Sequence, residues 1–367
     1  MKHQITLVGG QILPVYVGIK EFNPDKVHFF VSNDSKNGIS SLKSQIQKVK
    51  YSEYICNPFD FYEIKSICEK IVEKIESEDE VSFNLTGGTK IMVLAAQSVI
   101  HEKNLQGFYI NQDDTFLKLP EYKQSKINTE ISIKEFFTLS GHNIFSYKEL
   151  SDYTNNDFNV VKTIESFANT NKKYSSITNH FRRKYQKIPQ TGKESLQNGV
   201  IVTWDTKSIV AVFNGKTIFN ISSDKAMDLF FNAAWWELIV AQEVSKWNKI
   251  KEICLGLELP FKTDNKIMKN EIDLLINTGK KLFFIECKSG NVKQEDINKM
   301  KIIKQTYGGL ISKSVLVSRY MVNSNILEKC KELDIEVFYS YAFNNIEINP
   351  LSKLITTLNN INAKGSI

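Results

Sequence analysis

Short apolar runs and helical apolar stripes alternate along the first third of the chain. Runs with the length of strands lie at residues 4–8, 27–32, 54–56, 81–85 and 107–110. Stripes with helical spacing lie at residues 12–21, 39–50, 61–76 and 90–101. This alternation is typical of a parallel, doubly wound sheet. We therefore expect residues 1–125 to form a Rossmann-like α/β domain.

The middle of the chain, residues 126–225, shows a less regular pattern. Helices are expected at residues 131–139 and 147–153, and strands at residues 200–202, 208–212 and 217–221. The Asn214-Gly215 pair before the last of these strands is a hairpin signal. We therefore expect a small α+β linker module between two larger domains.

The last segment, residues 226–367, changes pattern again. One long apolar helix is expected at residues 226–247, and further helices at 294–307 and 325–333. Strands are expected at residues 271–276, 282–287, 315–318 and 336–339. This mixture predicts a second α/β domain with its own core.

Composition and charge narrow the class of protein. The chain has 367 residues, of which 42% are hydrophobic, and this suits a globular protein of several domains. No apolar run approaches the roughly 18 residues that span a membrane, and the five cysteines show no CxxC spacing. We therefore expect a reduced, cytoplasmic protein with no membrane partner. The net charge of +6 is compatible with a polyanionic partner.

Two glycine pairs follow predicted strands of the first domain. Gly9-Gly10-Gln11 leaves the first strand, and Thr86-Gly87-Gly88-Thr89-Lys90 leaves the fourth strand and opens a helix. Ligands of open α/β sheets bind at the carboxyl ends of strands, where helix N-termini attract phosphates. The threonine hydroxyls and the charge of Lys90 favour a nucleotide or phosphodiester site. A tight turn is the alternative for each pair, and without a P-loop or GxGxxG fingerprint ATP hydrolysis is not supported.

Three charged residues lie on two apolar segments of the last domain. Asp273 lies in the first segment, and Glu286 and Lys288 share one face of the second. If residues 277–280 form the loop between the segments, Asp273 lies opposite Phe284 and diagonal to Glu286, on the same face. This register brings two carboxylates and one cation together.

Two carboxylates and a lysine placed together favour metal-assisted hydrolysis of a phosphodiester. Asp273 and Glu286 can hold a hard divalent cation, Mg²⁺ or Mn²⁺. The metal would lower the pKa of bound water and neutralise a scissile phosphate, and Lys288 would orient or deprotonate that water. An amphipathic edge hairpin is the alternative reading, but both segments are apolar on both faces, where unpaired charge is costly. Glu237, in an otherwise apolar helix, is a third candidate carboxylate or a helix-edge residue.

These motifs resemble those of a known family. Asp273 followed by Glu286-Cys287-Lys288 resembles the PD-(D/E)xK nuclease motif, with Ile272 in place of the usual proline. Residues 84–90 resemble a loop of CRISPR-associated Rossmann-fold (CARF) sensor domains. Their order resembles the CARF–PD-(D/E)xK effector nucleases of type III CRISPR defence. The resemblance predicts a sensor domain at residues 1–125, a linker module at 126–225 and a nuclease domain at 226–367, with a restriction-endonuclease-like fold.

The resemblance also implies an activator and an assembly. It predicts a homodimer that binds one cyclic oligoadenylate, most simply cyclic tetra-adenylate, across its two-fold axis. The residues expected to line that pocket are Gly9, Gly10, Gln11, Ser32, Asn33, Thr86, Gly87, Gly88, Thr89 and Lys90. Ligand binding would activate metal-dependent cleavage of DNA, RNA or both. The basic segment 172–187 would help to hold the substrate backbone.

Three rival functions were weighed against this one. A metal-independent ribonuclease with an Arg-x4–6-His motif is excluded because every histidine precedes the first arginine, Arg182. A nucleotide-sensing transcription regulator would bind DNA without cleaving it, and the complete Asp273, Glu286 and Lys288 set argues against it. A stand-alone restriction or repair nuclease would use the first domain only as a scaffold.

Overall fold

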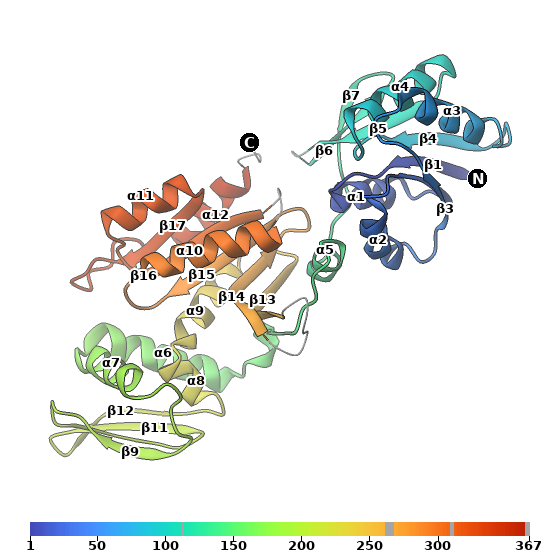
Figure 1. The fold of residues 1–367 in the computed structure, drawn as a ribbon. Helices are drawn as coiled ribbons and strands as arrows, with labels where there is room; N and C mark the ends of the chain where they lie inside the picture. The colour runs from blue at the N-terminus through green and yellow to red at the C-terminus, as the bar shows by residue number, and fades with distance from the viewer. Residues whose placement is uncertain (112–113, 261–267, 309–311, 364–367) are drawn as a thin grey trace.

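The computed structural model describes residues 1–111, 114–260, 268–308 and 312–363. Three sheets follow one another along the chain, with seven, four and six strands. In Figure 1 the N-terminal sheet and its helices stand apart from the other two sheets, and helix α5 (Ile133–Leu139) lies in the connection between them. The two α/β units predicted from the sequence are therefore present at opposite ends of the chain.

The N-terminal sheet has the strand order β3-β2-β1-β4-β5-β6-β7. Its parallel strands are β1 (Lys2–Leu7), β2 (Lys26–Val31), β3 (Lys50–Ile55), β4 (Glu80–Asn84) and β5 (Gln106–Ile110). The helices between them are α1 (Ile12–Phe22), α2 (Ile39–Gln45), α3 (Phe61–Val72) and α4 (Lys90–Glu102). The strand order reverses between β1 and β4, and this is the switch point at which such sheets bind ligands.

A hairpin extends this sheet beyond its predicted edge. Strands β6 (Thr115–Leu119) and β7 (Lys123–Lys126) run antiparallel to β5 and to each other. The sequence of β7, KQSK, contains no apolar residue, so no hydrophobic pattern marks it as a strand. Its position follows from pairing with β6 rather than from burial.

Within the middle segment, residues 155–222 form two helices and an antiparallel sheet. Helices α6 (Asn155–Thr170) and α7 (Lys173–Lys184) precede the sheet, whose order is β12-β11-β10-β9. The strands are β9 (Gly192–Ser195), β10 (Val200–Trp204), β11 (Ser208–Phe213) and β12 (Lys216–Ser222). The last three were predicted, and Asn214-Gly215 makes the expected turn with positive φ at both residues.

The helix expected at residues 147–153 is wrong. Strand β8 (Ser146–Lys148) pairs with β13 (Glu252–Pro260), and a 3₁₀ turn follows at Leu150–Asp152. Tyr147 is 46% exposed, so this strand is held by edge pairing rather than by a buried apolar face. A local pattern cannot reveal a partner strand about a hundred residues away.

The C-terminal sheet has the order β17-β16-β15-β14-β13-β8. Its other strands are β14 (Met268–Asn277), β15 (Leu282–Lys288), β16 (Ser312–Tyr320) and β17 (Ile335–Tyr341). Its helices are α8 (Ala226–Phe231), α9 (Ala234–Val244), α10 (Gln294–Ile303), α11 (Ser324–Glu332) and α12 (Lys353–Ala363). The single helix expected at residues 226–247 is therefore wrong, since Ala233, with φ of 62°, breaks it in two.

One hydrophobic core joins the middle segment to the C-terminal sheet. It runs from Val160 on α6, through Trp235 and Trp236 on α9, to Ile361 on α12. The indole of Trp235 donates to the hydroxyl of Tyr174 on α7, at 2.8 Å. Residues 126–225 and 226–367 thus pack as neighbours, and the boundary between them stays a prediction. No helix in the described part of the chain is long and apolar enough to cross a membrane.

Candidate functional site

Asp273 and Glu286 face each other on neighbouring central strands. Strands β14 and β15 pair from Leu274 opposite Ile285 to Asn277 opposite Leu282. The next position along this register places Asp273 opposite Glu286, and the Cys287 N–H donates to Asp273 Oδ2 at 2.7 Å. Both side chains are buried, with 9% and 3% of their surface exposed.

The predicted register of this hairpin is wrong by two residues. The loop is residues 278–281, one position later than expected, so Asp273 does not lie opposite Phe284. Asn277 continues the strand because its side chain donates to the Ile131 carbonyl at 2.6 Å. Gly279 turns the chain with φ of +85°. A shift of two residues keeps Asp273 on the face of Glu286, as predicted.

A network of opposite charges surrounds Glu286. Lys288 Nζ lies 2.8 Å from Glu286 Oε1 and 3.1 Å from Asp296 Oδ1. Lys299 Nζ lies 3.4 Å from Glu286 Oε2. Asp296 and Lys299 are three residues apart on α10, so they share the face that meets the site. Neither residue was predicted from the sequence, although their spacing on an amphipathic helix shortly after Lys288 was the available signal.

Glu237 lies near this group on helix α9, which packs against β13, β14 and β15. Burial, and then the negative charges of Asp273 and Glu271, raise the pKa of Glu237 to about 9. Burial and the charge of Glu286 raise the pKa of Asp273 to about 7. Three carboxyl groups are thus close enough to oppose one another's ionisation.

These residues fit a divalent cation. Glu286 Oε1 is enclosed and accepts no hydrogen bond in the described structure, although Lys288 pairs with it by charge. Among the described residues no group of three or more Asp, Glu, His or Cys side chains has metal-binding geometry. Two carboxylates with backbone oxygens and waters suffice for Mg²⁺, which keeps several waters in most sites. A cation would also relieve the repulsion that, after burial, raises the pKa values of Glu237 and Asp273.

Glu237 gives the metal-free protein a testable pH dependence. Its folded pKa of about 9 exceeds the ordinary value of about 4.3, so the folded state holds a proton that the unfolded chain releases. Between these values this contribution to stability decreases as pH rises. Glu237→Gln removes the titration, so the melting temperature of the variant minus that of the parent should increase from about pH 5 to about pH 9. Melts in EDTA would check this, and a difference that is constant with pH would contradict it.

The two glycine pairs pack against each other at the switch point. A Cβ on Gly87 would lie 2.2 Å from the Leu7 carbonyl oxygen, and one on Gly9 would lie 2.8 Å from the Gly88 nitrogen. Gly88 has φ of +80°, a conformation that favours glycine. The close approach of the two loops therefore requires Gly9, Gly87 and Gly88, whatever ligand binds beside them.

The polar residues of these loops also have partners within the fold. The Thr89 hydroxyl caps α4 by accepting from the Met92 N–H at 3.2 Å, and it donates to the Pro58 carbonyl. The Thr86 hydroxyl accepts from the Ile110 N–H at 3.0 Å. Ser32 bonds with Ser35 in the loop after β2, and Asn33 and Lys90 are exposed. Their roles toward a ligand stay predictions.

A cavity of about 660 Å³ lies beside these loops. Of the predicted ligand residues, Gly10, Gln11 and Thr86 line it, whereas Gly9, Ser32, Asn33, Gly87, Gly88, Thr89 and Lys90 do not. Its lining also includes Gly279 and Lys280, from the turn between β14 and β15. No pattern in the sequence indicated that residues from the two ends of the chain would line one cavity.

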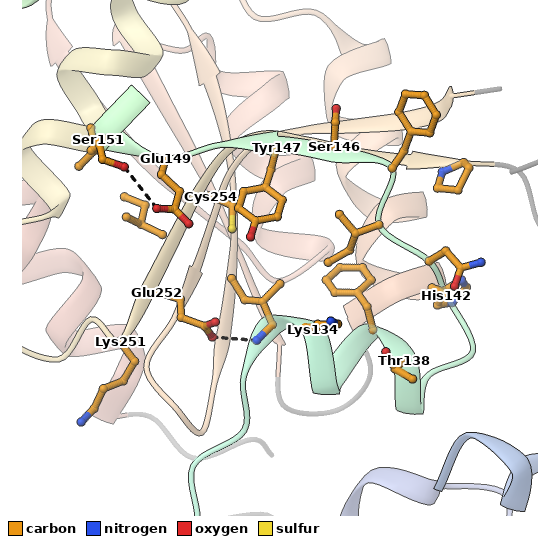
Figure 2. A pocket seen from close by; sticks show the side chains of 18 residues that line it. Lys134, Thr138, His142, Ser146, Tyr147, Glu149, Ser151, Lys251, Glu252 and Cys254 are labelled. Atoms are coloured by element: carbon orange, nitrogen blue, oxygen red, sulfur yellow. Dashed lines mark hydrogen bonds between the residues drawn. The ribbon is translucent and has the colours of Figure 1, made fainter. Parts of the chain in front are cut away.

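A larger cavity, of about 1020 Å³, lies between α5, β8 and β13 (Figure 2). It contains none of the predicted site residues. Figure 2 shows Glu252 bonded to the start of α5, where its carboxylate accepts from the Ile133 N–H at 2.8 Å. This contact fixes the start of α5 to strand β13 of the C-terminal sheet.

Comparisons with known proteins identify both ends of the chain. Residues 4–136 match the Card1 CARF domain family, and residues 224–347 match the Card1-like endonuclease domain family. No curated protein matches the sequence. Together the two domain matches cover more than half of the 367 residues.

Solved structures share this fold over nearly the whole chain. Can2 from Sulfobacillus thermosulfidooxidans, solved with cyclic tetra-adenylate, is 19% identical with a TM-score of 0.72, over 99% of this chain and 100% of that one. Protein VC1899 from Vibrio cholerae is 15% identical with a TM-score of 0.74, over 99% of each chain. A type III CRISPR defence DNA nuclease activated by cyclic oligoadenylate is 14% identical with a TM-score of 0.57, over 97% of this chain and 51% of its own. The chain therefore belongs to the proteins that join a Card1-type CARF domain to a Card1-like endonuclease domain.

Proposed function

We propose that this protein is a nuclease activated by a cyclic oligoadenylate, most simply cyclic tetra-adenylate, in type III CRISPR defence. The observation that carries the proposal is the pairing of Asp273 with Glu286 in the endonuclease domain of a chain that begins with a CARF domain. The bound messenger in Can2 supports the choice of activator. The endonuclease match and the paired carboxylates favour cleavage over a regulator that only binds DNA.

Asp273 and Glu286 would hold the metal ion, Mn²⁺ or Mg²⁺. When bound, that ion lowers the pKa of a coordinated water and neutralises charge on the scissile phosphate. The Cys287 N–H orients the Asp273 carboxylate by donating to Oδ2, which leaves Oδ1 for the metal. Glu286 turns its two oxygens toward two different lysines, so its charge is balanced before any ligand arrives.

Lys288 would act as a cation rather than as a base. Burial alone would lower its pKa, but the charges of Glu286 and Asp296 raise it above the ordinary value of lysine. The ammonium group therefore stays protonated at neutral pH, and it is placed to donate to the attacking water or to the phosphate. Asp296 also holds this ammonium, as a second carboxylate partner beside Glu286.

The basic end of α7 would hold the substrate backbone. Its last turn contains Arg182, Arg183 and Lys184. Arg182 Nη1 lies 3.7 Å from the position of a Cβ on Gly290, in the loop that leaves the β15 strand of Glu286 and Lys288. Exposed cations next to the site can neutralise phosphates of DNA or RNA without reading their sequence.

A homodimer completes the proposed assembly. A cyclic tetra-adenylate has two-fold symmetry, so two copies of the same pocket can each bind half of it. The carboxyl ends of β1 and β4, with Gly10, Gln11 and Thr86 in the cavity wall, are the surface expected to face the ring.

The test is a cleavage assay with a panel of activators and substrates. Plasmid, single-stranded DNA and RNA would be incubated with Mn²⁺ or Mg²⁺ and with cyclic oligoadenylates of different ring sizes. We expect cleavage only when both the metal and one ring, most simply the tetra-adenylate, are present. Equal cleavage without any ring would indicate a stand-alone nuclease, and tight duplex binding without cleavage would indicate a regulator.

A further inference from the structure

The β14–β15 hairpin carries Asp273 and Glu286 away from its turn. The turn itself lines the cavity of about 660 Å³ beside the glycine loops (the sensor cavity). Asp273 lies four residues before the end of β14 at Asn277, and Glu286 lies four residues after the start of β15 at Leu282. At about 3.3 Å per residue, the turn at residues 278–281 is roughly 13 Å from both carboxylates. The strands are paired along this length, so a displacement of the turn is passed to the carboxylates.

The turn is bonded to the segment that leaves the sensor domain. Gly279 O accepts from the Ile131 N–H at 2.7 Å, and Asn277 Nδ2 donates to Ile131 O at 2.6 Å. Lys280 Nζ donates to Ile127 O at 2.6 Å. Three direct bonds thus connect the nuclease hairpin to residues 127–131.

The same segment is bonded to the first helix of the sensor. The Glu21 carboxylate on α1 accepts from the Asn128 and Thr129 N–H groups, at 3.0 and 2.7 Å. Lys20 Nζ donates to Glu130 O at 3.0 Å. Helix α1 begins directly after Gly9-Gly10-Gln11, so its start borders the predicted ligand loops. A continuous set of bonds therefore runs from those loops to the catalytic strands.

Lys280, in the turn between β14 and β15, lines the cavity of about 660 Å³. Among the described residues that line the cavity of about 660 Å³, it is the only lysine or arginine. The same cavity is lined by Gly10 and Thr86 of the sensor domain, but not by Lys90. The recorded partner of the Lys280 ammonium is a neutral carbonyl, that of Ile127. A phosphate oxygen would be a stronger partner, since hydrogen bonds between ionised groups are the stronger class.

We propose that Lys280, from the nuclease domain, binds a phosphate of the messenger and transmits its presence to Asp273 and Glu286. On binding, the ammonium exchanges the Ile127 carbonyl for a phosphate oxygen, and the β14–β15 turn shifts with it. Asp114, the only carboxylate among the described lining residues, suits a ribose hydroxyl or an adenine amino group. The ligand class is thus a ribonucleotide phosphodiester. This inference rests on the proposed function, and it adds a contact and a route of activation.

Lys280→Met tests the proposal, since it keeps the aliphatic stem and removes the charge. Binding of cyclic tetra-adenylate would be measured by calorimetry, and the cleavage rate at saturating ligand by a fluorescent reporter. Because the variant loses a charge-assisted bond, we expect it to bind the ring about tenfold more weakly. We also expect its cleavage rate at saturating ligand to be about tenfold lower. Lys280→Arg keeps the charge and should recover most of the affinity and most of the saturated cleavage rate. Thermal melts establish that each variant is folded.

Lys251→Met is the matched control. Lys251 pairs with Glu130 at 2.9 Å across the same junction, but it does not line this cavity. The ring affinity and the saturated cleavage rate of Lys251→Met should each lie within twofold of the parental value. If Lys280→Met has parental affinity, or a parental rate at saturation, the inference is overturned. If the parent itself neither binds nor responds to the ligand, the proposed function fails as well, so the two failures are distinguishable.

Discussion

Replacing Glu286 by glutamine is expected to lower the cleavage rate by about a thousandfold. Glu286 is 3% exposed and its two oxygens meet Lys288 and Lys299. The amide keeps the shape but removes the charge that would hold the metal and balance the two ammonium groups. The rate would be measured on the best substrate, with Mn²⁺ and saturating cyclic tetra-adenylate.

Glu286→Gln also tests whether cleavage can be lost while binding of the ring is kept. Because the candidate active site lies at the far end of the β14–β15 hairpin from the cavity of about 660 Å³, binding of the ring should stay within threefold of the parent. Glu295→Gln, an exposed glutamate on α10, is the matched control and should cleave normally. A Glu286→Gln protein that cleaves at the parental rate would show that these carboxylates are not the active site.

Gly87→Ala is expected to destabilise the sensor domain by about 2–3 kcal/mol, the upper part of the range for overpacking. Its Cβ would lie 2.2 Å from the Leu7 carbonyl oxygen and 3.0 Å from the Gly9 nitrogen, so two backbone segments would have to separate. Backbone atoms cannot move aside as the end of a side chain can. Urea denaturation followed by circular dichroism would measure the loss.

Gly10→Ala provides the comparison within the same pair of loops. A Cβ on Gly10 meets no described atom within 4 Å, so its stability should stay within about 0.5 kcal/mol of the parent. Equal stability of Gly87→Ala and Gly10→Ala would contradict the close approach of the two loops. Because Gly10 lines the sensor cavity, its variant also reports on ligand binding in a folded protein.

The sequence predicted the sensor sheet well because its signals are local. Strands β1, β2, β4 and β5 are short apolar runs, and each helix between them has its own stripe, so periodicity locates them. Strand β3 (KYSEYI) is largely exposed, and only its last two residues fall in the predicted run 54–56. Strands β7 and β8 carry no such pattern, since β7 is held by pairing with its neighbour β6 and β8 by pairing with the distant strand β13. The break at Ala233 was also hidden, because both helices that it separates are apolar.

The candidate active site was predicted in its residues but not in its register. Alternation along a strand placed Asp273, Glu286 and Lys288 on one face, and this holds for any register shift of two. The position of the turn depends on Asn277, whose side chain bonds to a carbonyl 146 residues away in the sequence. Asp296 and Lys299 enter the site from a helix, so strand alternation could not reveal them.

For the two glycine loops, the structure shows a requirement for glycine that the sequence did not indicate. Glycine pairs after β1 and β4 suggested phosphate binding, and the structure adds that Gly87 and Gly9 let two loops approach each other. That requirement is a backbone contact between residues about 80 positions apart, which no local pattern records. Likewise, Lys90 was the expected cation of the pocket, whereas Lys280 lines the cavity from the other end of the chain.

Binding of the ring to the CARF domain is expected to switch on the nuclease. The most direct measurement is the initial rate of reporter cleavage, with Mn²⁺ present, as cyclic tetra-adenylate is titrated into a fixed concentration of the protein. The account predicts almost no cleavage without the ring and a linear rise that levels off at one ring for every two chains. A rate that is the same at every concentration of the ring would contradict it.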